Sequence, residues 1–178
     1  MLRHFGKMLE LFPFSPENPG ENVLRIQAIA STEPAILEQP FPDPLDPVEV
    51  RAAAEDFLHD DAAYSLDAWW GLWVYEKDWT LRPVRVTLHC FGPKFADSPY
   101  GDDQNTAEHL RIDFGLEARF LPDAELPNSA WYARSNLKGL VQFVHTLEEA
   151  VPMERRALWS ESGGNLAEKL ARAAQDLQ

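Results

Sequence analysis

The sequence predicts an α+β fold with one mainly antiparallel, twisted sheet, helices packed on one face of it, and helices concentrated in the C-terminal third. Two observations predict this fold class. Apolar and polar residues alternate over 22–30, 81–91 and 107–121, which is the period of a half-buried strand. After residue 135 the apolar residues recur at helical spacing instead. Because 178 residues, 45% of them hydrophobic, can bury one core, a single α+β domain over residues 1–178 is expected.

The N-terminal part is expected to begin with a hairpin. Residues 7–14 and 22–30 have strand composition, and the segment SPENPG between them has the prolines and glycine of a turn. A third extended piece at 35–39 leads into the proline arm, residues 40–47 (PFPDPLDP). Asp46, Pro47 and Glu49 then predict a helix start, with an N-cap carboxylate, a proline at the first position and an acid that reaches back. This helix should end within residues 59–67.

The middle of the chain predicts strands at 69–75, 81–91 and 107–121, with EKD as the first turn and residues 92–106 as a longer loop. In 81–91 the even positions, including Val84 and Cys90, are apolar, and the odd positions are polar. Because a slip of one residue would exchange the two faces, this pattern specifies which side chains point inward.

Three helices are expected in the last third of the chain, one of them a short helix through residues 153–159 (MERRALW). Ser135 is the predicted N-cap of a helix whose apolar face extends to Val151, with Pro152 interrupting it. Asn165 and Glu168 predict the start of another helix.

Composition excludes several function classes. A net charge of −13 and a pI near 4.7 argue against binding to nucleic acid, and they would attract a basic partner. The single Cys90 excludes an internal disulfide, and no apolar run is long enough for a signal peptide or a membrane span, so we expect a cytoplasmic protein. The motifs GxGxxG, GxSxG, HExxH and CxxC are absent, and no cofactor is expected.

The segment AWWGLWVYEKDW holds four of the six tryptophans and predicts the main candidate surface. Both faces of its strand are apolar, so one set of rings must lie outside the main core or be covered from the second side. The expected outer face is a candidate binding surface of aromatic and charged side chains, namely Trp69, Trp73, Tyr75, Arg85, His89, His109, Arg111 and Asp113. The alternative is a solvated face of cross-strand ion pairs, its rings covered by the proline arm or by the loop around Phe95 and Tyr100. A homodimer would use the same surface.

Catalytic and metal-binding arrangements have ordinary structural alternatives. His89, His109 and Asp113 could form a general base or metal site, but such residues also occur by chance on a polar face. The doublet at His59 and Asp60 and the oxygen-rich run at 97–105 are weak metal and calcium candidates. Cys90 is expected to be buried and inert, because it points away from His89.

The leading hypothesis is a non-catalytic protein-interaction module of the acidic inhibitor, immunity or adaptor type. One alternative is a small-molecule-binding protein or cryptic enzyme with a pocket on the outer sheet face under the proline arm. Another is a structural subunit of a homo-oligomer.

Overall fold

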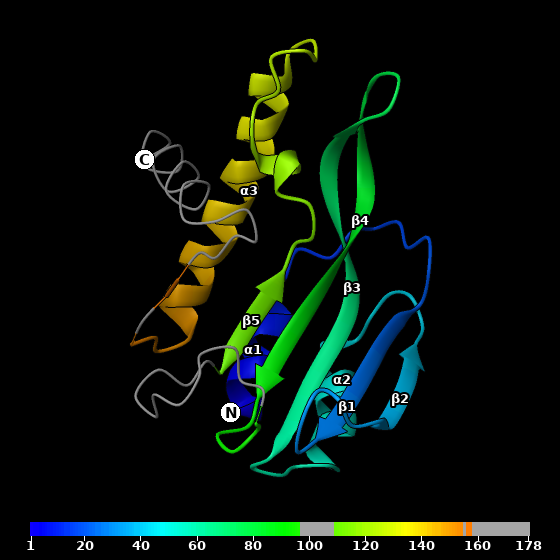
Figure 1. Ribbon diagram of the computed structural model, residues 1–178, viewed down its shortest axis with the longest axis vertical. Coiled ribbons are helices and arrows are strands. Elements are labelled where there is room, and N and C mark those ends of the chain that lie inside the picture. Colours follow the sequence, from blue (N-terminus) through cyan, green and yellow to red (C-terminus); the bar gives the residue numbers. More distant parts are fainter. Residues whose placement is uncertain (97–108, 155, 158–178) are drawn as a thin grey trace. The chain divides into compact units, whose positions relative to one another are not determined.

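The computed structural model describes residues 1–96, 109–154 and 156–157, and this part of the chain forms an antiparallel five-stranded sheet with three α-helices. The strand order is β2-β1-β3-β4-β5 (Figure 1). The elements are α1 (Leu2–Leu11), β1 (Asn22–Ala28), β2 (Ala35–Phe41), α2 (Pro47–Glu55), β3 (Ala62–Tyr75), β4 (Trp79–Phe91), β5 (Leu110–Asp113), the short 3-10 helix η1 (Glu117–Phe120) and α3 (Ser129–Ala150). The predicted α+β class is confirmed, and α3 is the longest of the described helices.

The chain divides into two compact units. The first comprises residues 1–70 and 83–114, and the second comprises residues 71–82 and 115–178. The strands β3 and β4 contribute to both units. The expectation of a single domain stays a prediction.

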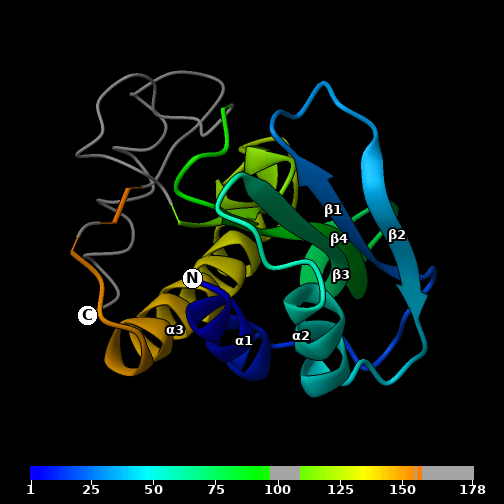
Figure 2. The same ribbon diagram turned by 90° about the horizontal axis from the view of Figure 1, so that it is seen from below.

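The N-terminal hairpin prediction is wrong, because residues 2–11 form α1 and β1 pairs with β2 and β3 instead. The buried residues Leu2, Phe5, Met8 and Leu9 recur at helical spacing, and this pattern is visible only when it is followed from residue 2. Read from residue 7 onward, the apolar run resembles a short strand. Figure 2 shows α1 and α2 side by side on one side of the sheet.

The predicted strands at 22–30 and 35–39 and the predicted helix cap are confirmed, but the helix ends at Glu55 and not within residues 59–67. β1 and β2 occupy the expected strand positions, although β2 continues through Pro40 to Phe41. Asp46 caps α2, since its carboxylate accepts a hydrogen bond of 2.8 Å from the Val48 N–H. Proline is tolerated in β2 because this strand lies at the edge of the sheet, where not every N–H needs a partner.

Within the first unit, β3 and β4 show the predicted alternation of inward and outward side chains. The inward side chains on β1, β3 and β4 are buried, namely Leu24, Ile26, Tyr64, Leu66, Val84, Val86, Leu88 and Cys90. β3 begins at Ala62, seven residues before the predicted start at Trp69. Residues 62–68 therefore belong to the sheet and not to the end of the preceding helix.

The strand predicted at 107–121 is much shorter than expected. Only Leu110–Asp113 forms β5, and residues 107–108 lie outside the described residues. Gly115 has φ +68°, a left-handed conformation that a side chain disfavours, and it ends the extended backbone. η1 follows in place of the predicted strand.

α3 begins six residues earlier than the predicted cap at Ser135. Its N-cap is Asn128, and it ends at Ala150, two residues before Pro152. The short helix expected at 153–159 is not formed at the described residues 153–154 and 156–157. The helix expected after Asn165 lies outside the described residues. Of the described helices, none is long and apolar enough to cross a membrane.

Candidate functional site

Asp67 is the centre of the polar outer face in the first unit. Its buried carboxylate accepts hydrogen bonds from the guanidinium groups of Arg25 and Arg85, and a third of 3.0 Å from the Thr87 hydroxyl. Arg25 also donates to Glu38 at 3.2 Å. The network joins side chains from β1, β2, β3 and β4 across one face of the sheet.

The hydrogen bonds to Asp67 favour the ionised form of its carboxylate. Burial alone would raise the pKa of Asp67, but the hydrogen bonds from Arg85, Arg25 and Thr87 outweigh burial and hold that pKa below its usual 3.8. The hydrogen bond to Asp67 also raises the pKa of the Arg25 guanidinium, against the opposing effect of burial. Asp67 is therefore ionised at neutral pH, and its charge is shared by two arginines.

The predicted site residues are divided between the two units. Trp69, Arg85, His89, His109, Arg111 and Asp113 belong to the first unit, and Trp73 and Tyr75 belong to the second. Both arginines of the predicted binding surface have carboxylate neighbours, because Arg85 contacts Asp67 and the Arg111 guanidinium lies 4.0 Å from Asp113. Cross-strand ion pairs thus account for much of this charged face.

Trp69 lies beneath the loop that precedes β1. A Cβ atom at Gly20 would lie 2.9 Å from Cζ2 of the indole, so this close approach requires glycine. The buried Trp69 Nε1 donates no hydrogen bond to any described residue. The observed contact on this ring comes from the loop containing SPENPG, which sequence reasoning treated only as a turn.

The two histidines of the predicted base or metal site are not directly opposite each other. His89 faces Arg111 in the β4–β5 register, and Thr87 faces Asp113. His109 precedes β5, and its carbonyl accepts a hydrogen bond of 3.0 Å from the Phe91 N–H. No group of three His, Cys, Asp or Glu side chains in the described part of the chain could hold a metal ion.

His89 is neutral at pH 7. Burial, with a further contribution from the positive charge of Arg111, lowers the pKa of its imidazole from 6.5 to about 4, although Asp113 and Asp67 oppose this shift. The ring stacks on Phe91 with the centroids 5.7 Å apart. His89 is therefore a packed, uncharged side chain at neutral pH.

We expect this burial to make stability depend on pH. The unfolded chain protonates His89 near pH 6.5 and the folded chain only near pH 4, so the unfolded state binds more protons in this window and stability falls as the pH falls through it. The shift corresponds to roughly 3 kcal/mol, and because part of the ring is exposed we expect a loss of about 2 kcal/mol. Urea denaturation at pH 7 and pH 4.5 measures this loss.

His89→Gln should lose less stability than the wild type between these two pH values. His145→Gln, which changes an exposed histidine, is the control and should behave as the wild type. An equal pH dependence in His89→Gln and the wild type would contradict this role of His89.

Cys90 is buried, as predicted, and burial raises the pKa of its thiol to about 12. A thiol with this pKa forms almost no thiolate at neutral pH. The side chain belongs to the core and not to a reactive site.

The second unit contains an aromatic cluster of five residues: Trp73, Tyr75, Trp79, Trp131 and Tyr132. Trp79 stacks on Tyr132 with the centroids 4.4 Å apart, and Trp73 meets Tyr132 at 5.0 Å. Trp131 contacts both Trp73 and Tyr132 edge to face, at 6.1 and 4.8 Å, yet 60% of the residue is exposed. In this cluster one exposed indole, that of Trp131, packs against half-buried aromatic side chains.

Asn136 holds α3 to β3 within the second unit. Its amide accepts a hydrogen bond from the Trp73 N–H at 2.8 Å and donates one to the Trp73 carbonyl at 3.0 Å, as a neighbouring strand would. A third bond of 2.8 Å goes to the Arg119 carbonyl. The side chain is buried and uses both donors and its acceptor.

Sequence reasoning missed three of these residues. Asp67 lies two positions before Trp69, so extending the strand pattern backward would have placed it on the outer face. Trp131 and Asn136 fell before and at the edge of a helix predicted to start at Ser135. Following the helical spacing back from Leu137 to Ala133 would have included Trp131 in α3.

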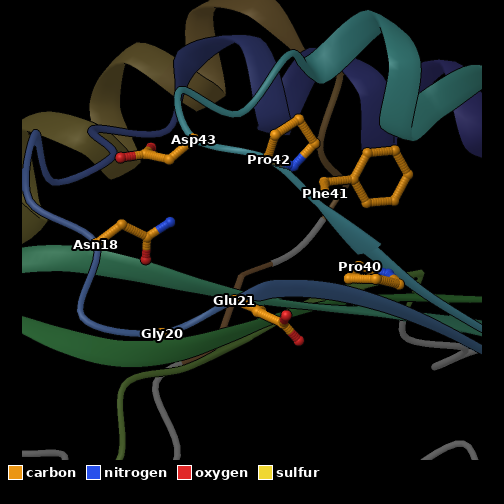
Figure 3. Close-up of a pocket in the computed structure, with 7 residues that line it drawn as sticks. All are labelled: Asn18, Gly20, Glu21, Pro40, Phe41, Pro42 and Asp43. Carbon is orange, nitrogen blue, oxygen red and sulfur yellow. The ribbon is translucent and has the colours of Figure 1, made fainter.

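An open pocket with a volume of about 320 Å³ lies in the first unit. Figure 3 shows it between the loop before β1 and the segment that includes the end of β2 and the start of the proline arm. Its lining residues are Asn18, Gly20, Glu21, Pro40, Phe41, Pro42 and Asp43.

Of the remaining metal candidates, the doublet at His59 and Asp60 lies within the described residues. Asp60 forms an ion pair of 3.0 Å with Lys94, which suits a solvated surface. The run at 97–105 lies outside the described residues, as does Tyr100.

No protein-family model, no curated protein and no solved structure matches this chain.

Proposed function

We propose that this protein is a non-catalytic protein-interaction module and that the aromatic cluster is the centre of its binding surface. The observation that carries this proposal is Trp131, a large indole that is 60% exposed while its ring packs against Trp73 and Tyr132. Trp73 and Tyr75, two residues of the predicted binding surface, lie in this cluster.

An exposed, pre-positioned tryptophan suits protein recognition. Tryptophan is enriched among the residues that dominate binding energy, because its ring buries a large area on association. The contacts with Trp73 and Tyr132 restrict the ring before binding, so less side-chain entropy is lost in the complex.

Charge supports a basic partner. The net charge of −13 would steer a positively charged protein toward this one, with an effect that falls as salt is added. The arginines of the first unit support the proposal less strongly, because Asp67 and Glu38 engage Arg25, and Asp67 also engages Arg85.

The test is quantitative capture of interacting proteins from a lysate of the source organism with the tagged wild type and two variants. Trp131→Ala is expected to weaken retention of a specific partner about 30-fold, which is the effect of losing a residue that dominates binding energy. Leu58→Ala, which removes an exposed apolar side chain from the first unit, is the matched control and should retain the partner.

Circular dichroism and thermal unfolding are the checks that Trp131→Ala remains folded. Equal retention by the wild type and Trp131→Ala would refute the role of the aromatic cluster. If the retained species is a second copy of this chain, the protein is instead the subunit of a homo-oligomer.

A further inference from the structure

The exposed side of α3 carries two basic side chains next to Trp131. Arg134 and Lys138 follow Trp131 by three and seven residues, so the three side chains lie along one face of the helix. All three residues are exposed to solvent. We call these three residues the α3 stripe. A partner that covers the Trp131 indole therefore also meets two positive charges.

The two cations of the α3 stripe are not paired within the described part of the chain. There, no Asp or Glu oxygen lies within 4.0 Å of the Arg134 guanidinium or the Lys138 ammonium group. By contrast, Glu148 on the same helix forms an ion pair of 2.8 Å with Arg156. The charges of Arg134 and Lys138 are therefore available to a carboxylate from outside.

The stability of the helix does not account for these two cations. Arg134 and Lys138 are four residues apart, and like charges at this spacing repel each other and weaken a helix. The helix dipole favours cations in the last turn, whereas both residues lie in the first half of Ser129–Ala150. Two cations that weaken their own helix point to a role in recognition.

The negative charge of the protein is concentrated in the first unit. That unit contains 18 acidic and 7 basic residues, whereas the second unit contains 11 acidic and 9 basic residues. The aromatic cluster thus belongs to the nearly neutral unit, and its one strongly exposed ring lies beside two cations. The local charge at Trp131 is opposite in sign to the net charge of the chain.

We propose that the α3 stripe binds an acidic segment of the protein partner, an inference that rests on the proposed interaction function. An apolar side chain of this segment packs on Trp131, and its carboxylates accept hydrogen bonds from Arg134 and Lys138. A guanidinium group binds a carboxylate with two parallel hydrogen bonds, and tryptophan and arginine are both enriched among residues that dominate binding energy. Because the stripe spans about 10 Å of helix, one short segment can contact all of it.

The two signs of charge have separate roles in this interaction. The acidic first unit attracts a basic region of the partner over a distance, and the α3 stripe selects the segment that contacts Trp131. Complementary charges of this kind fix the orientation of a complex and disfavour wrong partners. The α3 stripe therefore contributes specificity to the proposed binding surface.

The experiment is a selection of phage-displayed random peptides on the immobilised full chain, repeated with Trp131→Ala to identify the peptides that need this indole. These Trp131-dependent peptides should contain Asp and Glu about three times as often as the starting library, since one exposed ion pair changes binding by about threefold. Non-specific attraction to a chain with a net charge of −13 would enrich basic peptides instead.

The double variant Arg134→Glu, Lys138→Glu is expected to reverse the preference and select basic peptides that still need Trp131. It should also bind the tightest acidic peptide about tenfold more weakly, because two ion pairs of about threefold each are lost. An NMR titration that follows the indole N–H signal of Trp131 measures this change. The control Arg3→Glu, Lys94→Glu makes the same charge change at two exposed positions of the first unit and should bind this peptide as the wild type does.

Three results would overturn the inference. The first is a set of Trp131-dependent peptides with no enrichment of Asp and Glu, which would refute the acidic segment and leave the proposed function standing. The second is equal weakening by both double variants, which would show only a general effect of charge. The third is the absence of any Trp131-dependent peptide, in which case the lysate capture decides the proposed function independently.

A second copy of this acidic chain is the alternative occupant of the α3 stripe. Sedimentation velocity of the wild type alone detects it, and a monomer is expected. A dimer that dissociates in Arg134→Glu, Lys138→Glu would assign the α3 stripe to self-association and overturn the proposal of a separate partner.

Discussion

Replacing Asn136 by leucine is expected to lower the free energy of unfolding by about 4 kcal/mol. Leucine has nearly the same size, so the main loss is three hydrogen bonds, to the Trp73 N–H, the Trp73 carbonyl and the Arg119 carbonyl. The substitution leaves these backbone groups without their partner in a partly buried place, and each unsatisfied group costs about 1–3 kcal/mol.

Urea denaturation of Asn136→Leu, followed by circular dichroism, measures this effect. Gln142→Leu, at an exposed position on the same helix, is the control and should change stability by less than about 0.5 kcal/mol. A similar small change in Asn136→Leu would contradict the role of Asn136 in holding α3 to β3. Because Trp131 lies on the same helix, the aromatic cluster depends on this attachment.

Replacing Asp67 by alanine is expected to lower the free energy of unfolding by about 3 kcal/mol. The change removes the carboxylate that Arg25 and Arg85 share, and it leaves the Thr87 hydroxyl without its acceptor. The loss is below that of a fully buried pair, because Arg85 is 58% exposed and can turn to water, and Arg25 retains Glu38.

The pH dependence gives a second measurement on Asp67. Its folded pKa is lowered, so the stabilisation is present above the unfolded value of 3.8 and is lost as the pH falls through the folded value. Asp67→Ala should therefore lose less stability than the wild type in this acidic range. Asp78→Ala, at the exposed β3–β4 turn, is the control. Equal stability of Asp67→Ala and the wild type at pH 7 would refute the network.

The parts of the fold that the sequence predicts correctly have one buried and one exposed face. In β4 the alternation of Val84, Val86 and Leu88 with polar residues fixes both the strand and its orientation, because a one-residue shift would bury charge. The helix at residues 2–11 was missed because a short apolar segment fits both strand and helix patterns. At Gly115 the backbone conformation, not hydrophobicity, ends the strand.

The candidate site was harder to predict because it depends on pairings between distant residues. The alternation along each strand predicts that four side chains point outward, namely Arg85, His89, Arg111 and Asp113. It does not predict the register between strands, in which His89 faces Arg111. Two of the three hydrogen bonds of Asn136 join positions 63 residues apart. The arrangement that leaves Trp131 exposed beside Trp73 likewise arises only when α3 meets the β3–β4 hairpin within the second unit.

The most direct test of the proposed interaction function is native mass spectrometry of the tagged protein, captured gently from a lysate of its source organism at low and high salt. We predict a mass that exceeds the 20.2 kDa chain and its tag by that of a second protein at low salt, and release of that protein at high salt. The mass of the tagged chain alone under both conditions would contradict the proposal that this protein is an interaction module.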